Sequence, residues 1–395
     1  MRLDRRDAPA SDAGRLKGRI LCALAVLVLL IAAFAARSDP AAARDFTSPG
    51  EARSFKLAPG VHEFVFEASV GPSRFDRIAL HRFTSGARPP AHPPIVMLYL
   101  PGTNMNGEAE DDDPRYSLKL YFAQHGVDLW ALDYRTHFIP PQTPAEQLAE
   151  LKDWTNELFE SDIDAAARYI IAKTGRSRIF VSGFSRGASF AYLYASEHPE
   201  RLQGLLVFDG LILDDRRGSP PPGVYASDVG GKHLTWDKRQ TLLKMVIENP
   251  NGRAPLPEYK TASENLEHVV DYSAGFGGKG GLANPLGGFS NLDALARTLI
   301  SYDRYWPIVQ DYEDASGTEH AKALANSKIP VIAFSSTNIA PDWAERVTKS
   351  AASTGSSDVT LKRLAGWGHL DVICGSHAEQ EVFAPAVQWL RQRQK

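Results

Sequence analysis

Short, uninterrupted apolar runs recur along this chain and are separated by stretches with helical spacing. The clearest two runs are PIVMLYL, which ends at Leu100, and VDLWALD, which ends at Asp133. Runs of this length without polar alternation are typical of parallel strands that are covered on both faces. Further runs of the same kind lie at residues 178–182, 205–208, 330–334 and 359–364.

Helical patterns lie between these runs. Apolar residues recur at three- and four-residue steps over residues 144–174, 188–198 and 378–392. Val61–Ala68 and Arg77–Thr84 instead alternate apolar and polar residues, which predicts two antiparallel edge strands. The alternation of strands and helices predicts an α/β fold with a mostly parallel sheet and helices on both faces.

One long connection breaks this rhythm. Residues 210–325 hold helical stretches at 236–247 and 292–309 and a glycine-rich stretch at 275–288. We interpret this segment as a helical cap inserted between the sixth and seventh strands. The predicted core then has two parts, residues 44–209 and residues 326–395.

The first 43 residues resemble an export signal. Basic residues precede Ile20–Ala36, which carries no charge, and small-residue A-x-A patterns follow. This order is typical of a secretory signal peptide. The uncharged run is long for the apolar part of such a signal and short for a membrane span. An uncleaved N-terminal membrane anchor is therefore the alternative interpretation. We expect an exported chain, periplasmic or secreted, with membrane association through residues 20–36 if the segment is not cleaved.

Charge and cysteine content exclude several classes of protein. Lys and Arg number 44 against 47 Asp and Glu, giving a net charge of −3, which argues against a nucleic-acid binder. The chain has two cysteines, and Cys22 lies in the apolar N-terminal run, so a disulfide framework or a cysteine-based metal cluster is not expected. The histidines show no ligand-like spacing. We expect neither a metal nor a cofactor.

The chemistry is concentrated at Gly183-Phe184-Ser185-Arg186-Gly187, a G-x-S-x-G pattern between a predicted strand and a predicted helix. A nucleophile on so sharp a turn needs a strained backbone, and flanking glycines relieve the crowding. The helix N-terminus behind the serine favours the negative charge that develops during acyl transfer.

This turn and the alternation around it resemble the α/β-hydrolase superfamily over about residues 61–390. The resemblance implies that Ser185 is the nucleophile and that the amide of Arg186 forms half of an oxyanion hole. The second amide usually comes from the loop after the third strand. That loop is Leu100–Asn106 here, and Thr103 is the matching donor.

The resemblance also implies a histidine base after the last strand. His369 stands in Gly366-Trp367-Gly368-His369-Leu370, directly after the run at 359–364. A glycine-flanked loop at the carboxyl edge of the sheet can bring a histidine to the serine hydroxyl. The wider segment HLDVICGSHAEQEVF resembles the C-terminal region of acid lipases.

Two aspartates compete for the role of the acid that orients this histidine. Most members place the acid in the loop after the strand at 330–334. An alignment without gaps puts Asn338 or Ile339 at that position, and neither is a carboxylate. The first carboxylate in the loop is Asp342. Some members place it at the end of the preceding strand, where this chain has Asp209. We favour Asp209 and keep Asp342 as the alternative.

The sequence therefore predicts a serine hydrolase that cleaves carboxylic esters through an acyl-enzyme, with an ester or a lipid as substrate. A thioesterase or another acyl hydrolase would use the same residues. An exported binding protein with an inactive hydrolase fold is the non-enzymatic alternative.

Overall fold

The computed structural model describes residues 45–212, 218–229, 234–273, 288–313 and 318–394. The predicted signal or anchor at residues 1–43, including the apolar segment 20–36, lies outside these ranges and stays a prediction. Among the described residues, no helix combines the length and the apolar character that crossing a bilayer requires.

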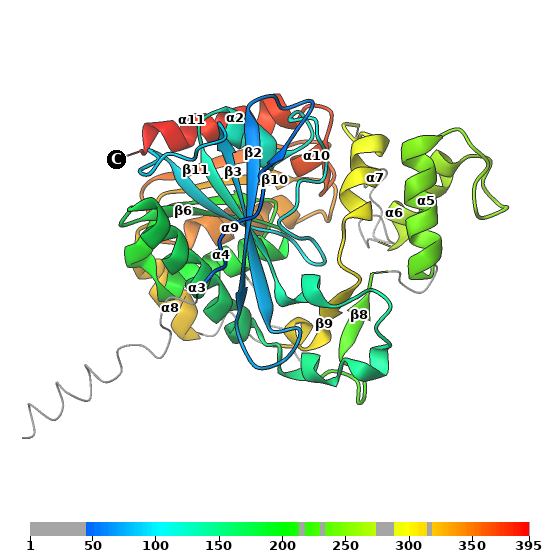
Figure 1. Ribbon diagram of the computed structural model, residues 1–395, viewed down its shortest axis with the longest axis horizontal. Coiled ribbons are helices and arrows are strands. Elements are labelled where there is room, and N and C mark those ends of the chain that lie inside the picture. Colours follow the sequence, from blue (N-terminus) through cyan, green and yellow to red (C-terminus); the bar gives the residue numbers. More distant parts are fainter. Residues whose placement is uncertain (1–44, 213–217, 230–233, 274–287, 314–317, 395) are drawn as a thin grey trace, which may run out of the picture. The chain divides into compact units, whose positions relative to one another are not determined.

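A nine-stranded sheet forms the centre of the fold (Figure 1). In spatial order its strands are β1 (Arg53–Ser54), β2 (Val61–Ser69), β3 (Arg77–Ser85), β5 (Asp128–Asp133), β4 (Val96–Leu100), β6 (Ile179–Phe184), β7 (Leu202–Phe208), β10 (Val331–Ser336) and β11 (Val359–Leu364). Neighbours from β1 to β5 pair antiparallel, and neighbours from β5 to β11 pair parallel. The apolar runs thus form the parallel part, and the alternating segments form the antiparallel end, as the sequence predicts.

Helices cover both faces of this sheet (Figure 1). Successive side chains of a strand point to opposite faces. In β4, Met97 and Tyr99 accordingly belong to one apolar cluster, and Leu98 and Leu100 belong to the other. The first cluster includes residues of α2 (Leu118–Gln124), α10 (Asp371–Cys374) and α11 (Ala384–Gln392). The second includes residues of α3 (Asn156–Thr174), α4 (Arg186–Glu197), α8 (Thr318–Ser327) and α9 (Trp343–Ala352).

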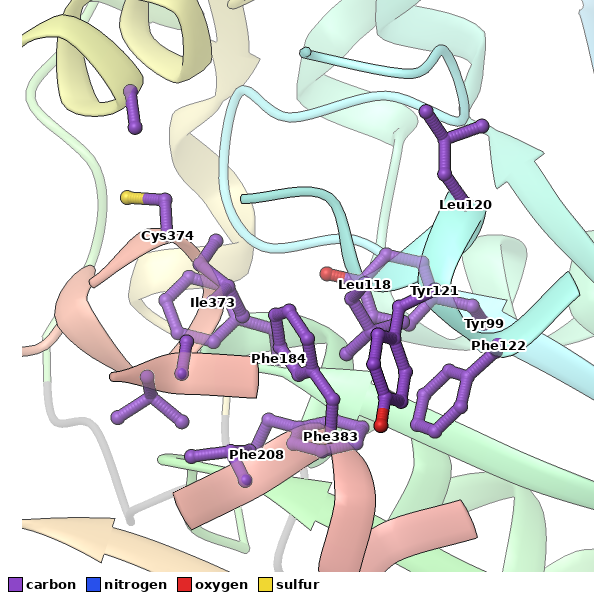
Figure 2. Close-up of a cluster of buried hydrophobic side chains, with 14 of the residues drawn as sticks. Tyr99, Leu118, Leu120, Tyr121, Phe122, Phe184, Phe208, Ile373, Cys374 and Phe383 are labelled. Carbon is purple, nitrogen blue, oxygen red and sulfur yellow. The ribbon is translucent and has the colours of Figure 1, made fainter. Parts of the chain in front are cut away.

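Figure 2 shows part of the first cluster. Tyr99 of β4 and Phe122 of α2 lie in it with Phe383, and Phe184 and Phe208 come from the carboxyl ends of β6 and β7. The aromatic packing therefore extends from the middle of the sheet to the residues that precede Ser185 and Asp209. Burial of this apolar surface holds the two strand ends at a fixed separation.

The helix predicted over residues 144–174 begins later than its pattern indicates. Its first part forms 3₁₀ turns, η2 (Ala145–Gln147) and η3 (Ala149–Asp153), and α3 begins only at Asn156. The side chain of Thr155 accepts a hydrogen bond from Leu158 N, and this N-cap sets the start of α3. The composition of residues 144–153 suits a helix, but the cap decides the boundary.

The segment between β7 and β10 contains helices and also a small sheet. The helices are α5 (Trp236–Glu248), α6 (Ala262–Ser273), α7 (Leu292–Ile300) and α8. The helix predicted over 292–309 is wrong in its second half, where β9 (Tyr305–Pro307) pairs with β8 (Ala226–Asp228). Pro307 disfavours helical backbone in the residue before it, which explains the change. The described segment is therefore not purely helical.

The strand register places four chain segments at one edge of the sheet. Gly183 of β6 pairs with Leu100 of β4 and with Val207 of β7. Phe208 of β7 pairs with Phe334 of β10. Because parallel strands end at the same edge, the residues that follow β4, β6, β7 and β10 meet there.

Candidate active site

Ser185 stands on a sharp turn between β6 and α4. Its backbone has φ 54° and ψ −121°, a conformation that residues with a side chain rarely adopt. The Ser185 amide donates to Phe208 O at 3.0 Å, and the Ser185 carbonyl accepts from Ala188 N at 3.0 Å. The turn is thus tied to β7 on one side and to the first turn of α4 on the other.

Glycine is required on both sides of this serine because neighbouring backbone passes too close for a side chain. A Cβ atom on Gly183 would overlap the carbonyl of Gly187. A Cβ atom on Gly187 would overlap the carbonyl of Leu100. Packing of α4 against β4 and β6 therefore explains the G-x-S-x-G pattern, and the turn has the form of a nucleophile elbow.

His369 lies in the loop between β11 and α10. Its Nδ1 is 2.6 Å from Asp209 Oδ2, and the two side chains are 5% and 0% exposed. The imidazole stacks on Phe184 with 4.6 Å between ring centroids and meets Trp343 edge-on at 6.1 Å. Because Nδ1 faces the carboxylate, proton exchange with a reacting group would run through Nε2.

Asp209 follows β7 directly and has a φ of 50°. Besides His369 Nδ1, its carboxylate accepts hydrogen bonds from Ser336 N at 2.7 Å, Ser336 Oγ at 2.6 Å and Trp343 Nε1 at 2.9 Å. A buried carboxylate is tolerated only where its oxygens are hydrogen-bonded, and these contacts meet that need. Residues from β10 and α9 therefore hold Asp209 in a single orientation toward His369.

The structure brings Asp209 to His369 and places Asp342 elsewhere. Asp342 is an exposed residue at the start of α9, and its side chain makes no capping hydrogen bond to that helix. The neighbouring Trp343 is the residue of this segment that contacts both Asp209 and His369. No pattern in the sequence indicated that Ser336 and Trp343 would bond to Asp209.

A cavity of about 190 Å³ opens at Ser185. Thr103 and Arg186, the predicted oxyanion-hole residues, both line it. Gly102 packs directly against the serine, because a Cβ atom there would lie 3.2 Å from Ser185 Cβ. The remaining lining residues come from α4, from the segment after β7 and from α9: Ser189, Leu211, Ile212, Gln310, Asp311, Glu313 and Trp343.

The side chain of Arg186 joins this cavity to the segment between β7 and β10. Its guanidinium donates to Asp311 Oδ1 at 2.8 Å and to Gln310 O at 3.3 Å. Burial raises the pKa of Glu313, against the amide of Asn156 and the charge of Arg186. The cavity beside Ser185 is therefore lined largely by polar and charged groups, and no sequence pattern indicated Gln310, Asp311 or Glu313.

Asp371 holds the loop that carries His369. Its Oδ2 accepts from Gly368 N at 2.7 Å, and its Oδ1 accepts from Ser290 Oγ at 2.5 Å. Burial, assisted by the charge of Asp209, raises the pKa of Asp371 to about 6, although these two hydrogen bonds oppose the shift. The local pairing that Asp371 makes fits a role in fixing the loop backbone.

No protein-family model matches the chain. The chain is 28% identical to human lipase member K over 105 residues, which is a quarter of each protein. A candidate lipase from Sulfolobus solfataricus superposes with a TM-score of 0.71 at 26% identity, covering 88% of this chain and 99% of the other. A monoglyceride lipase from Saccharomyces cerevisiae gives a TM-score of 0.43 at 15% identity, covering 90% and 99% of the two chains.

The similarities to the Sulfolobus structure and to the human lipase agree with what the strands and the turn already indicate. The sheet has antiparallel strands at one end, a parallel majority and a serine elbow after β6, and the Sulfolobus structure matches it over most of both chains. The curated lipase adds sequence similarity over a shorter stretch. On this fold and these relatives, the chain belongs to the α/β-hydrolase superfamily.

Proposed function

We propose that the chain is a serine hydrolase that cleaves carboxylic esters through an acyl-enzyme intermediate. The observation that carries this proposal is the convergence of Ser185, the buried His369–Asp209 pair and a cavity lined by Thr103 and Arg186 at one edge of the sheet. The relatives named as lipases support an ester as the bond that is cleaved.

In the first half of the reaction, Ser185 Oγ attacks the acyl carbon of the ester and His369 Nε2 takes the hydroxyl proton. The tetrahedral intermediate collapses when the ester C–O bond breaks, and His369 returns the proton to the departing alcohol oxygen. Water then attacks the acyl-enzyme by the same proton route, which frees the acid and restores the serine. Asp209 keeps His369 in the tautomer and orientation that both halves need.

The negative charge of each tetrahedral intermediate develops on the former carbonyl oxygen. We assign its stabilisation to the backbone N–H groups of Thr103 and Arg186, one from the loop after β4 and one from the N-terminus of α4. Donors fixed before the reaction contribute most, because no reorganisation is needed as the charge forms.

The test is the turnover of p-nitrophenyl acetate by the full chain and by Ser185→Ala and His369→Ala. Each variant should lose at least about 10³-fold in kcat, because the first removes the nucleophile and the second removes the base that activates it. Ser182→Ala is the matched control: Ser182 is buried in β6, and its hydroxyl donates to Leu98 O at 3.2 Å, away from the cavity. Unchanged turnover in Ser185→Ala would contradict the proposal.

A further inference from the structure

The loop after β4 carries Thr103 and runs from Gly102 to Gly107. Inside the loop, Met105 N donates to Gly102 O at 3.0 Å, and Asn104 has a φ of 62°. Asn104 and Asn106 are nevertheless 7% and 3% exposed, so the loop is covered along its length. The groups that cover it decide how firmly Thr103 is held.

Asn104 is bonded to Asp303, which lies between α7 and β9. Asp303 N donates to Asn104 O at 2.7 Å. Asn104 Nδ2 donates in return to Asp303 O at 2.9 Å. This reciprocal pair joins residues that are 199 positions apart in the sequence. The residue that follows Thr103 is therefore fixed by the segment between β7 and β10.

Asn106 makes a second pair of contacts with the same segment. Its Nδ2 donates to Ser301 O at 2.7 Å and lies 3.3 Å from Asp303 Oδ1. Thr103 thus lies between a hydrogen-bonded residue on its C-terminal side and Gly102, which packs against Ser185 on its N-terminal side.

Asp303 is itself anchored to the 3₁₀ turn η1 (Arg135–Phe138), which follows β5. Its carboxylate accepts from His137 Nδ1 at 3.0 Å and from Thr136 Oγ1 at 3.4 Å. Burial lowers the pKa of His137, but the carboxylates of Asp133 and Asp303 raise it by more, to about 9. Asp133 also accepts from Gly107 N at 2.6 Å, at the far end of the loop. One charged cluster therefore holds both Asp303 and the C-terminal end of the loop.

We propose that the segment Ser301–Asp303, which we name the 301–303 clamp, positions the oxyanion hole by fixing the loop of Thr103 through Asn104 and Asn106. This inference rests on the proposed ester hydrolysis. Asn104, Asn106 and Asp303 are positioning residues in it, because they act through Thr103. The long insertion after β7 thereby completes a site whose reacting groups all come from the core.

The physical reason is the sensitivity of oxyanion stabilisation to distance. A donor must lie about 3 Å from the place where the charge develops, and a displacement of about 1 Å can cost on the order of 10²-fold in rate. A loop without fixed partners would have to be ordered in every catalytic cycle. The clamp removes that requirement by ordering the loop in the free enzyme.

The kinetic test uses Asn106→Ala and Asn104→Gly. Glycine accepts the positive φ at position 104 and removes only the side-chain bond to Asp303 O. We expect kcat to fall on the order of 10- to 100-fold with little change in KM. Affinity for a trifluoromethyl ketone should fall in parallel, because its serine adduct places an oxyanion in the same hole.

A second measurement does not depend on activity. Hydrogen exchange of the backbone amides at residues 102–107 should be faster in Asn106→Ala than in the wild type. The matched control is Asp228→Ala, which breaks a 2.8 Å ion pair with Arg304, the residue directly after the clamp. That variant should keep both the kinetics and the exchange of the wild type.

The outcomes separate the two proposals. If the wild type hydrolyses esters and Asn106→Ala keeps its kcat, its inhibitor affinity and its slow exchange, the clamp is overturned and the hydrolase stands. If the wild type has no esterase activity, the proposed function fails. In that case, faster exchange in Asn106→Ala still supports the inference that the clamp fixes the loop of Thr103, and unchanged exchange overturns that inference.

Discussion

At the scale of single residues, the decisive contact is the one between His369 and Asp209. The carboxylate is fully buried and receives hydrogen bonds from His369, Ser336 and Trp343. Such an environment fixes the direction in which the carboxylate faces the imidazole. Asp342, the alternative, has an exposed position at the start of α9. The geometry therefore favours Asp209 for the role of orienting the histidine.

Comparison of Asp209→Asn with Asp342→Asn tests this assignment. Asn at position 209 keeps the shape of the side chain but favours the wrong tautomer of His369, so kcat on p-nitrophenyl acetate should fall on the order of 10⁴-fold. Asp342→Asn should stay within about twofold of the wild type. A larger loss in Asp342→Asn than in Asp209→Asn would reverse the assignment.

The contacts that hold Asp209 in place come from distant parts of the chain, so the sequence could not predict them. Asp209 was favoured because it ends an apolar strand at the edge where the histidine loop was expected. Nothing in the local pattern indicated that Ser336 and Trp343 would bond to it, because they follow β7 by more than a hundred residues in the chain. Contacts of this kind depend on the register of β7 with β10, which a single sequence does not show.

At the scale of elements, buried charges tie the antiparallel end of the sheet to its parallel part. His81 of β3 lies with Nδ1 2.7 Å from Glu63 of β2 and Nε2 2.8 Å from Asp133 of β5. Burial lowers the pKa of His81, but the carboxylates of Asp133 and Glu63 raise it by more, to about 10. The cationic imidazole is thus stabilised between two carboxylates, at the point where the loop of Thr103 also bonds to Asp133.

This arrangement predicts how stability depends on pH. A histidine whose folded-state pKa is raised from 6.5 to about 10 stabilises the fold fully below pH 6.5, and this contribution is lost as the pH rises through 10. The difference in unfolding free energy between the wild type and His81→Gln should therefore be larger at pH 6 than at pH 10. Urea unfolding at both pH values measures it, and an equal difference at the two would contradict the charged state of His81.

The elements themselves were predicted well where one periodicity dominated. The parallel strands and α5 lie within a few residues of their predicted positions. A strand buried on both faces leaves a continuous apolar run in the sequence, and a helix buried along one stripe leaves apolar residues at three- and four-residue steps. Residues 301–309 were misassigned for a physical reason. The backbone of Asp303 is bonded to Asn104, and β9 is paired with β8, so tertiary contacts override a pattern that suits a helix.

At the scale of the whole molecule, the segment between β7 and β10 contributes residues to the site. It supplies Gln310, Asp311 and Glu313 to the cavity at Ser185 and the 301–303 clamp to the loop of Thr103. The long connection between two apolar runs predicts an insertion over residues 210–325. Its contribution to the site could not be predicted, because polar residues in a variable segment carry no periodic signal.

The size and polarity of the cavity lead to a prediction about the substrate. A volume of about 190 Å³ is below the range of roughly 300–1,000 Å³ that is common for pockets of larger ligands. The polar lining also disfavours a long hydrocarbon chain. We expect kcat/KM of the full chain on p-nitrophenyl esters to be highest for acetate or butyrate and to fall by at least about tenfold at palmitate. A preference that rises steadily with chain length would contradict this view of the cavity.

The central claim is that Ser185 is a nucleophile activated by His369, and labelling of the full chain with a fluorophosphonate tests it most directly. The reagent forms a stable phosphonyl adduct only with an activated serine. We predict one adduct per chain, located on Ser185 by peptide mass spectrometry, absent in Ser185→Ala and formed much more slowly in His369→Ala. A folded wild-type protein that is not labelled, or labelling that persists in Ser185→Ala, would contradict the claim.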